Sequence, residues 1–332
     1  MPVQNNISVP TVSVIMSVYN EPIDWIQQAA DSILNQTFTD FEFIIINDKP
    51  DREENKTLLS ELSEKDRRIR VVNNPENIGL TASLNKGIQL AKGNYIARMD
   101  ADDISLENRF REQVQFLESN LNIGICGTDA RIIDKEGTVT NKMWLYHKSE
   151  VLKASIISYC PFIHPTIMGR RHIFEANKYD ENCRVAQDWN LWLRLVESVQ
   201  FANIPKVLFH YRIHQCQSQV KAGAERSIKS RMYADSIFAD KLSLEGEIRK
   251  LFIKSRSDEP MSLQELDRLY DYLFKMSFDG KSRTYAMCKF ISVLKNKCGI
   301  QKLFSSKTVK KNPALFIQAL LFYFGGLIRI RL

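Results

Sequence analysis

The stretch LTASLNKGIQLAKGNYIARMDADD, residues 80–103, decides the fold. Its first half spaces apolar residues for a helix that closes at Gly93, and NYIARMD then predicts a buried strand. Three carboxylates fall within four positions at the end of that strand: Asp100, Asp102 and Asp103. Carboxylates this close repel one another at neutral pH, so either solvent screens them or a cation lies among them.

Strand and helix patterns alternate on the amino-terminal side of this stretch. Strand-like runs occur at TVSVIMSV (11–18), FEFIIIN (41–47) and IRVV (69–72), with helical spacings between them. This alternation predicts β-α-β units, an α/β fold and a mainly parallel central sheet flanked by helices. Ligands of such sheets bind beyond the carboxyl ends of the strands. Polar residues gather at three of these ends: Ser17, Tyr19, Asn20 and Glu21; Asn47 and Asp48; Asp100, Asp102 and Asp103.

The bulk composition is that of a folded protein. The chain has 332 residues, of which 44% are hydrophobic and 26% are charged, so disorder is not expected. The six cysteines are far apart with no C-x-x-C pair, and MPVQNNISVP has no basic segment followed by an apolar core. We therefore expect a cytoplasmic protein with reduced thiols.

The pattern changes along the second half of the chain. IGICGTDARIID (123–134) and FIHPTIMGRR (162–171) predict strands, and QDWNLWLRLVE (187–197) predicts an amphipathic helix. After residue 219 the pattern is almost wholly helical. We therefore expect a domain at 1–219 and a helical, basic region at 220–332.

The carboxyl-terminal end is basic and apolar. Residues 281–332 contain eleven Lys or Arg and no Asp or Glu. The segment 312–332 is mostly apolar, but its uninterrupted run is shorter than the roughly twenty residues of a spanning helix. It is predicted to contact an anionic membrane surface. The alternatives are a buried terminal helix and, less favoured, a nucleic-acid contact.

The acidic stretch at 100–103 suits Mg²⁺ or Mn²⁺. Hard cations take oxygen ligands and often share them with the phosphates of a substrate. The alternative is a solvated turn in which Asp103 or Ser105 caps the next helix. Because Asp48 and Asp100 end strands at the same edge of the sheet, the ligand site is favoured.

Four blocks, in this order, resemble the inverting family 2 glycosyltransferases, especially bacterial enzymes that build O-antigen repeat units. The blocks are SVIMSVYNE (13–21), DSILNQTFTDFEFIIIND (31–48), NIGLTASLNKGIQLAKGNYIARMDADD (77–103) and AQDWNLWLRL (186–195). The likeness covers roughly residues 10–215. It implies a GT-A fold, which is Rossmann-like, followed here by a helical carboxyl-terminal appendage.

The resemblance also implies the donor site. Tyr19 would stack on the base, usually uracil, and Asp48 would accept a hydrogen bond from it, with Ser17 and Glu21 nearby. Asp100 would contact the ribose or the donor sugar, and Asp102 would bind Mn²⁺ or Mg²⁺ on the diphosphate. Many relatives have an arginine near Leu84 that reaches the donor. This chain has none there, so Arg98 or Arg109 is expected to compensate.

The acceptor side is implied in the same way. Asp188 corresponds to the catalytic base, although its neighbours Gln187 and Asn190 replace two acids of the family pattern. His164 and Trp189 are expected at the acceptor site, although a core position is an alternative for each. His214, in HYRIH (210–214), is expected to complete the metal shell.

The activity implied is transfer of a hexose, Gal or Glc with a β linkage, from a UDP-sugar to HexNAc on a lipid (polyprenyl) diphosphate. The enzyme would be peripheral on the inner face of the bacterial plasma membrane. One alternative is a sugar-1-phosphate nucleotidyltransferase, which needs a glycine-rich loop after its first strand, whereas SVYNEPIDW (17–25) has no glycine. The other is a catalytically inactive membrane-associated binding protein, which Gln187 and Asn190 keep open.

Overall fold

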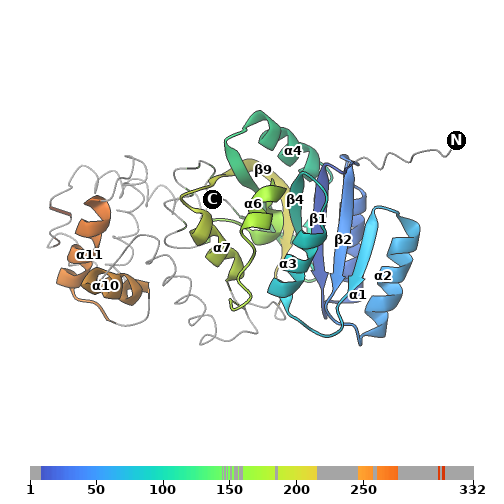
Figure 1. Cartoon of the computed structure of the whole chain (residues 1–332), viewed down its shortest axis with the longest axis horizontal. Helices are drawn as coiled ribbons and strands as arrows, with labels where there is room; N and C mark the ends of the chain where they lie inside the picture. The colour runs from blue at the N-terminus through green and yellow to red at the C-terminus, as the bar shows by residue number, and fades with distance from the viewer. Residues whose placement is uncertain are drawn as a thin grey trace.

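The computed structural model of the chain is shown in Figure 1. The structure describes the following residues: 9–143, 160–183, 186–214, 246–256 and 260–275, with single positions at 145, 147, 149, 152, 156, 306, 309 and 310. The predicted membrane-surface segment 312–332 and the predicted domain boundary near 219 lie outside these residues.

The strands of the described residues form a nine-stranded sheet, in the order β3-β2-β1-β4-β8-β6-β9-β5 with β7 beside β6. Its strands are β1 (Val12–Val18), β2 (Phe41–Asn47), β3 (Ile69–Asn73), β4 (Tyr95–Asp100), β5 (Ile104–Ser105), β6 (Ile123–Ile133), β7 (Val139–Met143), β8 (Met168–Arg170) and β9 (Gln200–Arg212).

The sheet has a parallel half and a mixed half. Strands β3, β2, β1 and β4 are parallel, as the sequence predicts for β-α-β units. Beyond β4, β8 pairs antiparallel with both β4 and β6, while β6 and β9 are parallel to each other. The α/β fold is confirmed, and its parallel character is concentrated in the amino-terminal half.

Helices cover both faces of the sheet. They are α1 (Ile23–Leu34), α2 (Glu53–Lys65), α3 (Leu80–Leu90), α4 (Arg109–Ser119), α6 (Arg171–Ala176) and α7 (Gln187–Leu195), with a short 3-10 helix η1 (His164–Thr166). Apolar residues of α1, α2 and α4 share one buried cluster with Val14 and Ile45, and those of α3, α6 and α7 share another with Ile15 and Ile44. Adjacent strand residues thus face opposite layers, as the two-residue period of a strand requires.

The predicted strand at 162–171 is only partly a strand. His164–Thr166 form the 3-10 helix η1, and only Met168–Arg170 join the sheet as β8. Pro165 explains the difference, because proline has no N–H to give to a strand ladder.

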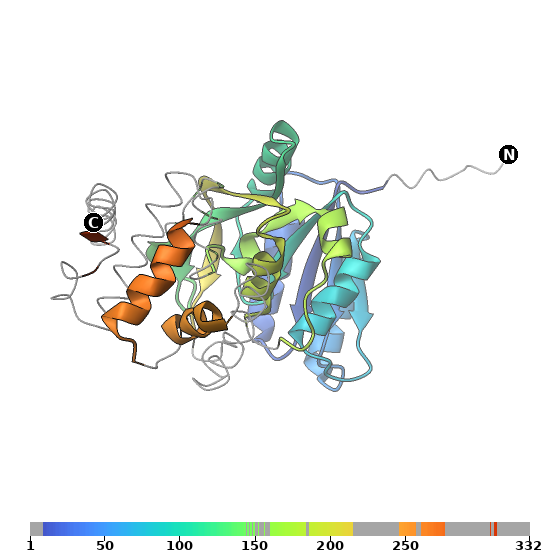
Figure 2. The same ribbon diagram turned by 60° about the vertical axis from the view of Figure 1, so that its left-hand side comes forward.

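In the carboxyl-terminal region the structure describes two further helices, α10 (Gly246–Arg256) and α11 (Leu263–Lys275). They lie side by side (Figure 2). Leu251 of α10 and Leu266 of α11 belong to the same buried cluster as Trp192 of α7. Among the described helices, none is long and apolar enough to cross a membrane.

Gly93, in the turn between α3 and β4, has no room for a side chain. Its N–H donates to the Ser13 hydroxyl at 2.8 Å, and a Cβ here would lie 2.6 Å from the Ser13 nitrogen and 2.7 Å from the Val12 carbonyl carbon. Both contacts are with the backbone of β1, which cannot move aside as a flexible side chain can.

We expect Gly93→Ala to lower the free energy of unfolding by about 3 kcal/mol, the cost of forcing atoms into a packed site. Gly246→Ala is the control, because Gly246 has a φ of +54° but nothing lies within 4 Å of the place that a Cβ would take. It should cost only the left-handed strain of about 1 kcal/mol. Urea denaturation followed by circular dichroism measures both. Equal costs for the two variants would contradict this packing argument.

Candidate functional site

The parallel half of the sheet brings the predicted polar clusters together at one edge. Ser17 of β1 lies beside Asp100 of β4, and the N–H of Asp48 donates to the carbonyl of Val18 at 2.8 Å. The loops after β1, β2 and β4 therefore open onto the same space. This convergence was predicted from the strand order expected of β-α-β units.

The acidic loop after β4 forms a group of oxygen ligands. One carboxylate oxygen from each of Asp100, Asp102 and Asp103 lies within 4.8 Å of the other two. Burial raises the pKa of Asp100 and Asp103, and the neighbouring carboxylates raise them further. The Oδ2 atom of Asp103 is buried and has no hydrogen-bond partner in the described part of the chain. This donor set fits a hard divalent cation.

The end of β9 holds the acidic loop in place. The N–H of Arg212 donates to Oδ1 of Asp103 at 2.7 Å, and its Nε donates to the Asp102 carbonyl at 2.7 Å. The guanidinium also donates to the carbonyls of Asp134 and Lys135 and to the side chain of Gln28. The sequence interpretation missed Arg212, although it lies between the two histidines of HYRIH.

His214 lies beside the predicted metal ligand Asp102. Its Nε2 is 2.8 Å from Oδ2 of Asp102, and its ring meets the indole of Trp25 edge-on with ring centres 4.8 Å apart. The two residues predicted to share a metal are thus in contact, although 112 positions separate them in the chain.

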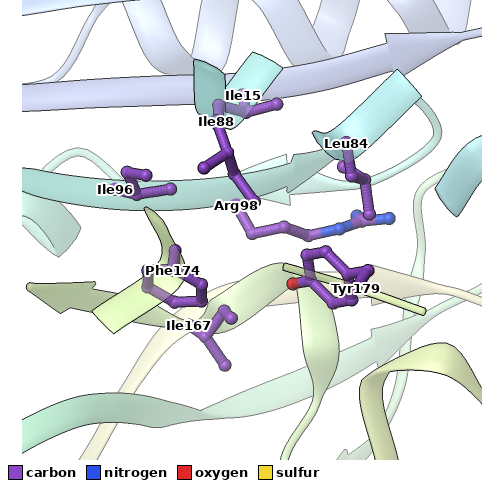
Figure 3. Close-up of a pocket in the computed structure, with 8 residues that line it drawn as sticks. All are labelled: Ile15, Leu84, Ile88, Ile96, Arg98, Ile167, Phe174 and Tyr179. Carbon is purple, nitrogen blue, oxygen red and sulfur yellow. The ribbon is translucent and has the colours of Figure 1, made fainter. Parts of the chain in front are cut away.

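Arg98 carries a buried positive charge beneath the acidic loop. It is 4% exposed, and its Nη1 contacts Oδ1 of Asp100. Figure 3 shows its side chain crossing a small pocket, with the guanidinium beside Leu84 and the ring of Tyr179 next to it. The Nε atom has no hydrogen-bond partner within the described ranges. Arg98 therefore reaches the position near Leu84 where many relatives are expected to carry an arginine.

Arg109 has a different role from the compensating one considered from the sequence. It is fully buried, and its guanidinium donates to the side chain of Gln113 and to the carbonyls of Arg98 and Ile167. These contacts join α4 to β4 and to the residue that follows η1. Arg109 therefore holds the scaffold beneath the site, and Arg98 is the arginine that faces the acidic loop.

The loop after β1 exposes an aromatic ring. Tyr19 is 42% exposed, and Lys49 lies 5.9 Å from the centre of its ring. Glu21 accepts a hydrogen bond from the Tyr19 N–H at 2.8 Å. Burial raises the pKa of Glu21, and the charges of Asp102 and Asp100 raise it further, so Glu21 belongs electrostatically to the acidic loop.

Asp48 is buried and joins β2 to the start of α3. Its Oδ1 accepts hydrogen bonds from Asn74 and from the N–H of Ile78, and its Oδ2 accepts one from the N–H of Gly79, all at 2.8 to 2.9 Å. These bonds fix the loop that precedes α3. Asp48 is thus a positioned carboxylate at the edge of the site, and its contact with a base stays a prediction.

Asp188 lies in the first turn of α7. Burial raises its pKa, while the N–H of Trp189, the thiol of Cys160 and the charge of Arg98 oppose that rise. Gln187 and Asn190 are both buried and carry no charge, so they do not raise the pKa of Asp188 as two acids would. The burial of Asp188 itself raises its pKa instead. The preceding residue, Ala186, has a left-handed backbone with φ of 58°, a conformation that costs an alanine about 1 kcal/mol.

The two residues expected at the acceptor site differ in exposure. His164 is partly exposed, its Nε2 lies 2.7 Å from the Tyr179 hydroxyl, and burial lowers its pKa well below the usual value. Trp189 is 4% exposed, and its indole N–H donates to the Ile156 carbonyl at 2.7 Å. Trp189 is therefore a core residue in this structure, with no open face for a sugar, and its acceptor contact has no geometric support.

Comparisons with known proteins agree with this geometry. The sequence model of Glycosyl transferase family 2 matches residues 13–177. A glycosyltransferase of Methanocaldococcus jannaschii is 36% identical over 207 residues, which cover 61% of this chain and 71% of that protein. The chain belongs to glycosyltransferase family 2. The family 2 domain therefore includes the loops after β1, β2 and β4.

Two further similarities bear on this glycosyltransferase. An O-antigen biosynthesis glycosyltransferase of Escherichia coli, WbnJ, is 31% identical over 215 residues, which cover 64% of this chain and 83% of that protein. The crystal structure of S. aureus TarS 1–349 in complex with UDP-GlcNAc superposes with a TM-score of 0.60 at 14% identity, covering 92% of this chain and 91% of that one. The latter confirms the GT-A fold of the glycosyltransferase.

We expect Arg212→Lys to lower the free energy of unfolding by about 2 kcal/mol, because a lysine cannot reproduce the guanidinium fork that donates to several acceptors at once. The acidic loop should also lose order, so Mn²⁺ affinity measured by calorimetry should fall severalfold.

Arg131→Lys is the control, since Arg131 is exposed on the neighbouring strand β6. It should change neither quantity measurably. Unchanged stability and Mn²⁺ affinity in Arg212→Lys would show that the acidic loop does not depend on the Arg212 guanidinium.

Proposed function

We propose that this glycosyltransferase transfers a hexose, Gal or Glc, from a UDP-sugar to a lipid diphosphate-linked HexNAc with inversion at the anomeric carbon, and that it requires Mn²⁺ or Mg²⁺. The observation that carries the proposal is that Asp188 is close enough to Arg98 and Asp100 for their charges to interact. The charge of Arg98 favours the ionised form of both carboxylates, and the charge of Asp188 raises the pKa of Asp100.

The acidic loop provides the metal site in this proposal. Asp102 and His214 would hold the ion, with Asp100 and Asp103 supplying further negative charge. A divalent ion bound there neutralises the diphosphate and so lowers the cost of its departure. Arg98 adds positive charge beneath the same carboxylates. In this proposal it would also contact the donor sugar.

The donor nucleoside would be held by the loops after β1 and β2. The exposed ring of Tyr19 is suited to stack on a base, and Asp48 is fixed by three hydrogen bonds at the adjacent strand end. Ser17 and Glu21 complete this side. The TarS structure was solved with UDP-GlcNAc, and a mannosyltransferase of Pyrobaculum calidifontis with a similar fold was solved with GDP-Man and Mn²⁺. These neighbours support a nucleotide-sugar donor, and UDP as its nucleotide is part of the proposal.

Asp188 would act as the general base. Its carboxylate takes the proton from the acceptor hydroxyl as that oxygen bonds to the anomeric carbon, while the bond from this carbon to the diphosphate oxygen breaks and UDP leaves. A carboxylate within hydrogen-bond reach of the hydroxyl suffices for this step. Its raised pKa places the base nearer to neutral pH and makes it a stronger proton acceptor. His164 would line the acceptor side.

The acceptor and its location extend the proposal further. Similarity to an O-antigen biosynthesis enzyme supports a sugar carried on a lipid diphosphate. The basic residues of 281–332 would bring the enzyme to the anionic inner face of the plasma membrane, where such an acceptor is found. No nucleic-acid partner is proposed.

We expect Asp188→Asn to reduce transfer by about 10²- to 10⁴-fold, the usual contribution of a positioned general base. The assay measures UDP release from a panel of UDP-sugars with Mn²⁺ and a synthetic lipid-diphosphate HexNAc acceptor. UDP binding, measured by calorimetry, should persist in the variant.

Asp24→Asn, on the exposed face of α1, is the matched control and should keep full activity. Full activity of Asp188→Asn would overturn the assignment of the base. UDP binding by the wild type without transfer to any acceptor would favour the alternative of an inactive binding protein.

We expect Asp102→Asn to abolish stabilisation by Mn²⁺. In the wild type, Mn²⁺ at a hundred times its dissociation constant should stabilise the fold by about 2.7 kcal/mol, and EDTA should reverse this effect. Thermal melting with and without Mn²⁺ measures both proteins. If the melting temperature of the wild type is the same with and without Mn²⁺, the proposed metal site is contradicted.

A further inference from the structure

Cys160 contacts the candidate base and has no part in the function proposed above. It lies two residues before Phe162 and four before His164, on the chain segment that leads into η1. Its Sγ is 3.3 Å from Oδ2 of Asp188 and 3.5 Å from the carbonyl oxygen of Phe162. The thiol is partly exposed, whereas Cys126 and Cys183 are buried.

The thiol has one proton and two acceptors within reach. An ionised carboxylate is a stronger acceptor than a peptide carbonyl, so the S–H points to Asp188 while that residue is charged. Once Asp188 has gained a proton, the carboxyl group is the weaker acceptor, and the carbonyl of Phe162 becomes the better one. A rotation about the Cα–Cβ–Sγ–H torsion, without movement of the backbone, exchanges the two.

We propose that Cys160 is a positioning residue for Asp188, whose S–H donates to the carboxylate before proton transfer and turns to the Phe162 carbonyl after it. This inference rests on the role of Asp188 as the base. The thiol holds one carboxylate oxygen and thereby sets the direction of the other. It loses its strongest hydrogen bond only in the step in which Asp188 becomes neutral.

The state of the thiol agrees with this role. Burial raises the pKa of Cys160 well above its usual value, and the negative charge of Asp188 raises it further. The sulfur therefore stays protonated at neutral pH and remains a donor. The indole of Trp192 acts on the same sulfur in the opposite direction and only partly offsets this rise in pKa.

The first test compares Cys160→Ala with Cys160→Ser in the transfer assay. Alanine removes the donor, so kcat should fall about tenfold, the size of one modest hydrogen bond to a charged group. The KM for the donor should stay within twofold, because Tyr19 and Asp48 are untouched. Serine keeps an O–H donor and should recover most of the lost kcat. Wild-type kcat in the alanine variant, or equal losses in both variants, would overturn the proposal.

The second test needs no activity and leaves Cys160 in place. Asp188→Asn removes the charge that raises the thiol pKa, so iodoacetamide should alkylate Cys160 severalfold faster than in the wild type. Mass spectrometry of the peptide that contains residue 160 measures the rate. The peptides of Cys126 and Cys183 are internal controls, and Asp24→Asn is the matched variant; neither should show a change.

Failure of the assignment of Asp188 as the base can be distinguished from failure of the proposal for Cys160. If Asp188→Asn retains full transfer activity, the assigned base is wrong, whatever the alkylation rates are. If Asp188→Asn is inactive but alkylates Cys160 at the wild-type rate, the base stands and the coupling between thiol and carboxylate is overturned.

Discussion

Arg98 and Arg212 offset the carboxylates that the end of β4 brings together, and the arrangement of the site depends on this balance. Carboxylates packed this closely raise the pKa of one another, so a loop without either arginine would tend to take up protons or open to water. Arg98 acts through its charge from within the sheet, against Asp100. Arg212, at the end of β9, closes the loop from the other side through hydrogen bonds to its backbone and to Asp103. Strand β4 from the parallel half of the sheet and strand β9 from the mixed half thus fix the geometry of the acidic residues before any ligand binds.

Local patterns in the sequence were enough to predict the parallel half of the fold. The alternation in residues 11–103 predicted β1 to β4 and α1 to α3, because each signal lies within one element and each element follows its neighbour directly. The convergence of Ser17, Asp48 and Asp100 followed from strand direction alone. The mixed half was harder to predict, because the pairing of β8 between β4 and β6 joins segments far apart in the chain.

The parts of the site that the sequence did not reveal depend on long-range contacts. Arg212 meets the acidic loop across 109 positions, and Cys160 meets Asp188 across 28. No spacing rule links such pairs. Arg109 and Arg98 look alike as arginines among apolar residues, and only the packing of α4 shows which one faces the scaffold. For Trp189 the helical period was correct, but a period does not tell which side of a helix the core covers.

The strand order places β4 at the boundary between the parallel half and the mixed half of the sheet. The proposed nucleotide contacts lie on β1, β2 and β4, while Asp188, Cys160 and His164 follow the segments beyond α4. The proposed donor-binding residues and the proposed acceptor-binding residues thus lie in two consecutive segments of the sequence. If recombination replaced the second segment by that of a related enzyme, the acceptor specificity would change and the donor specificity would stay. This requires that the last residues of β9 still fit the acidic loop.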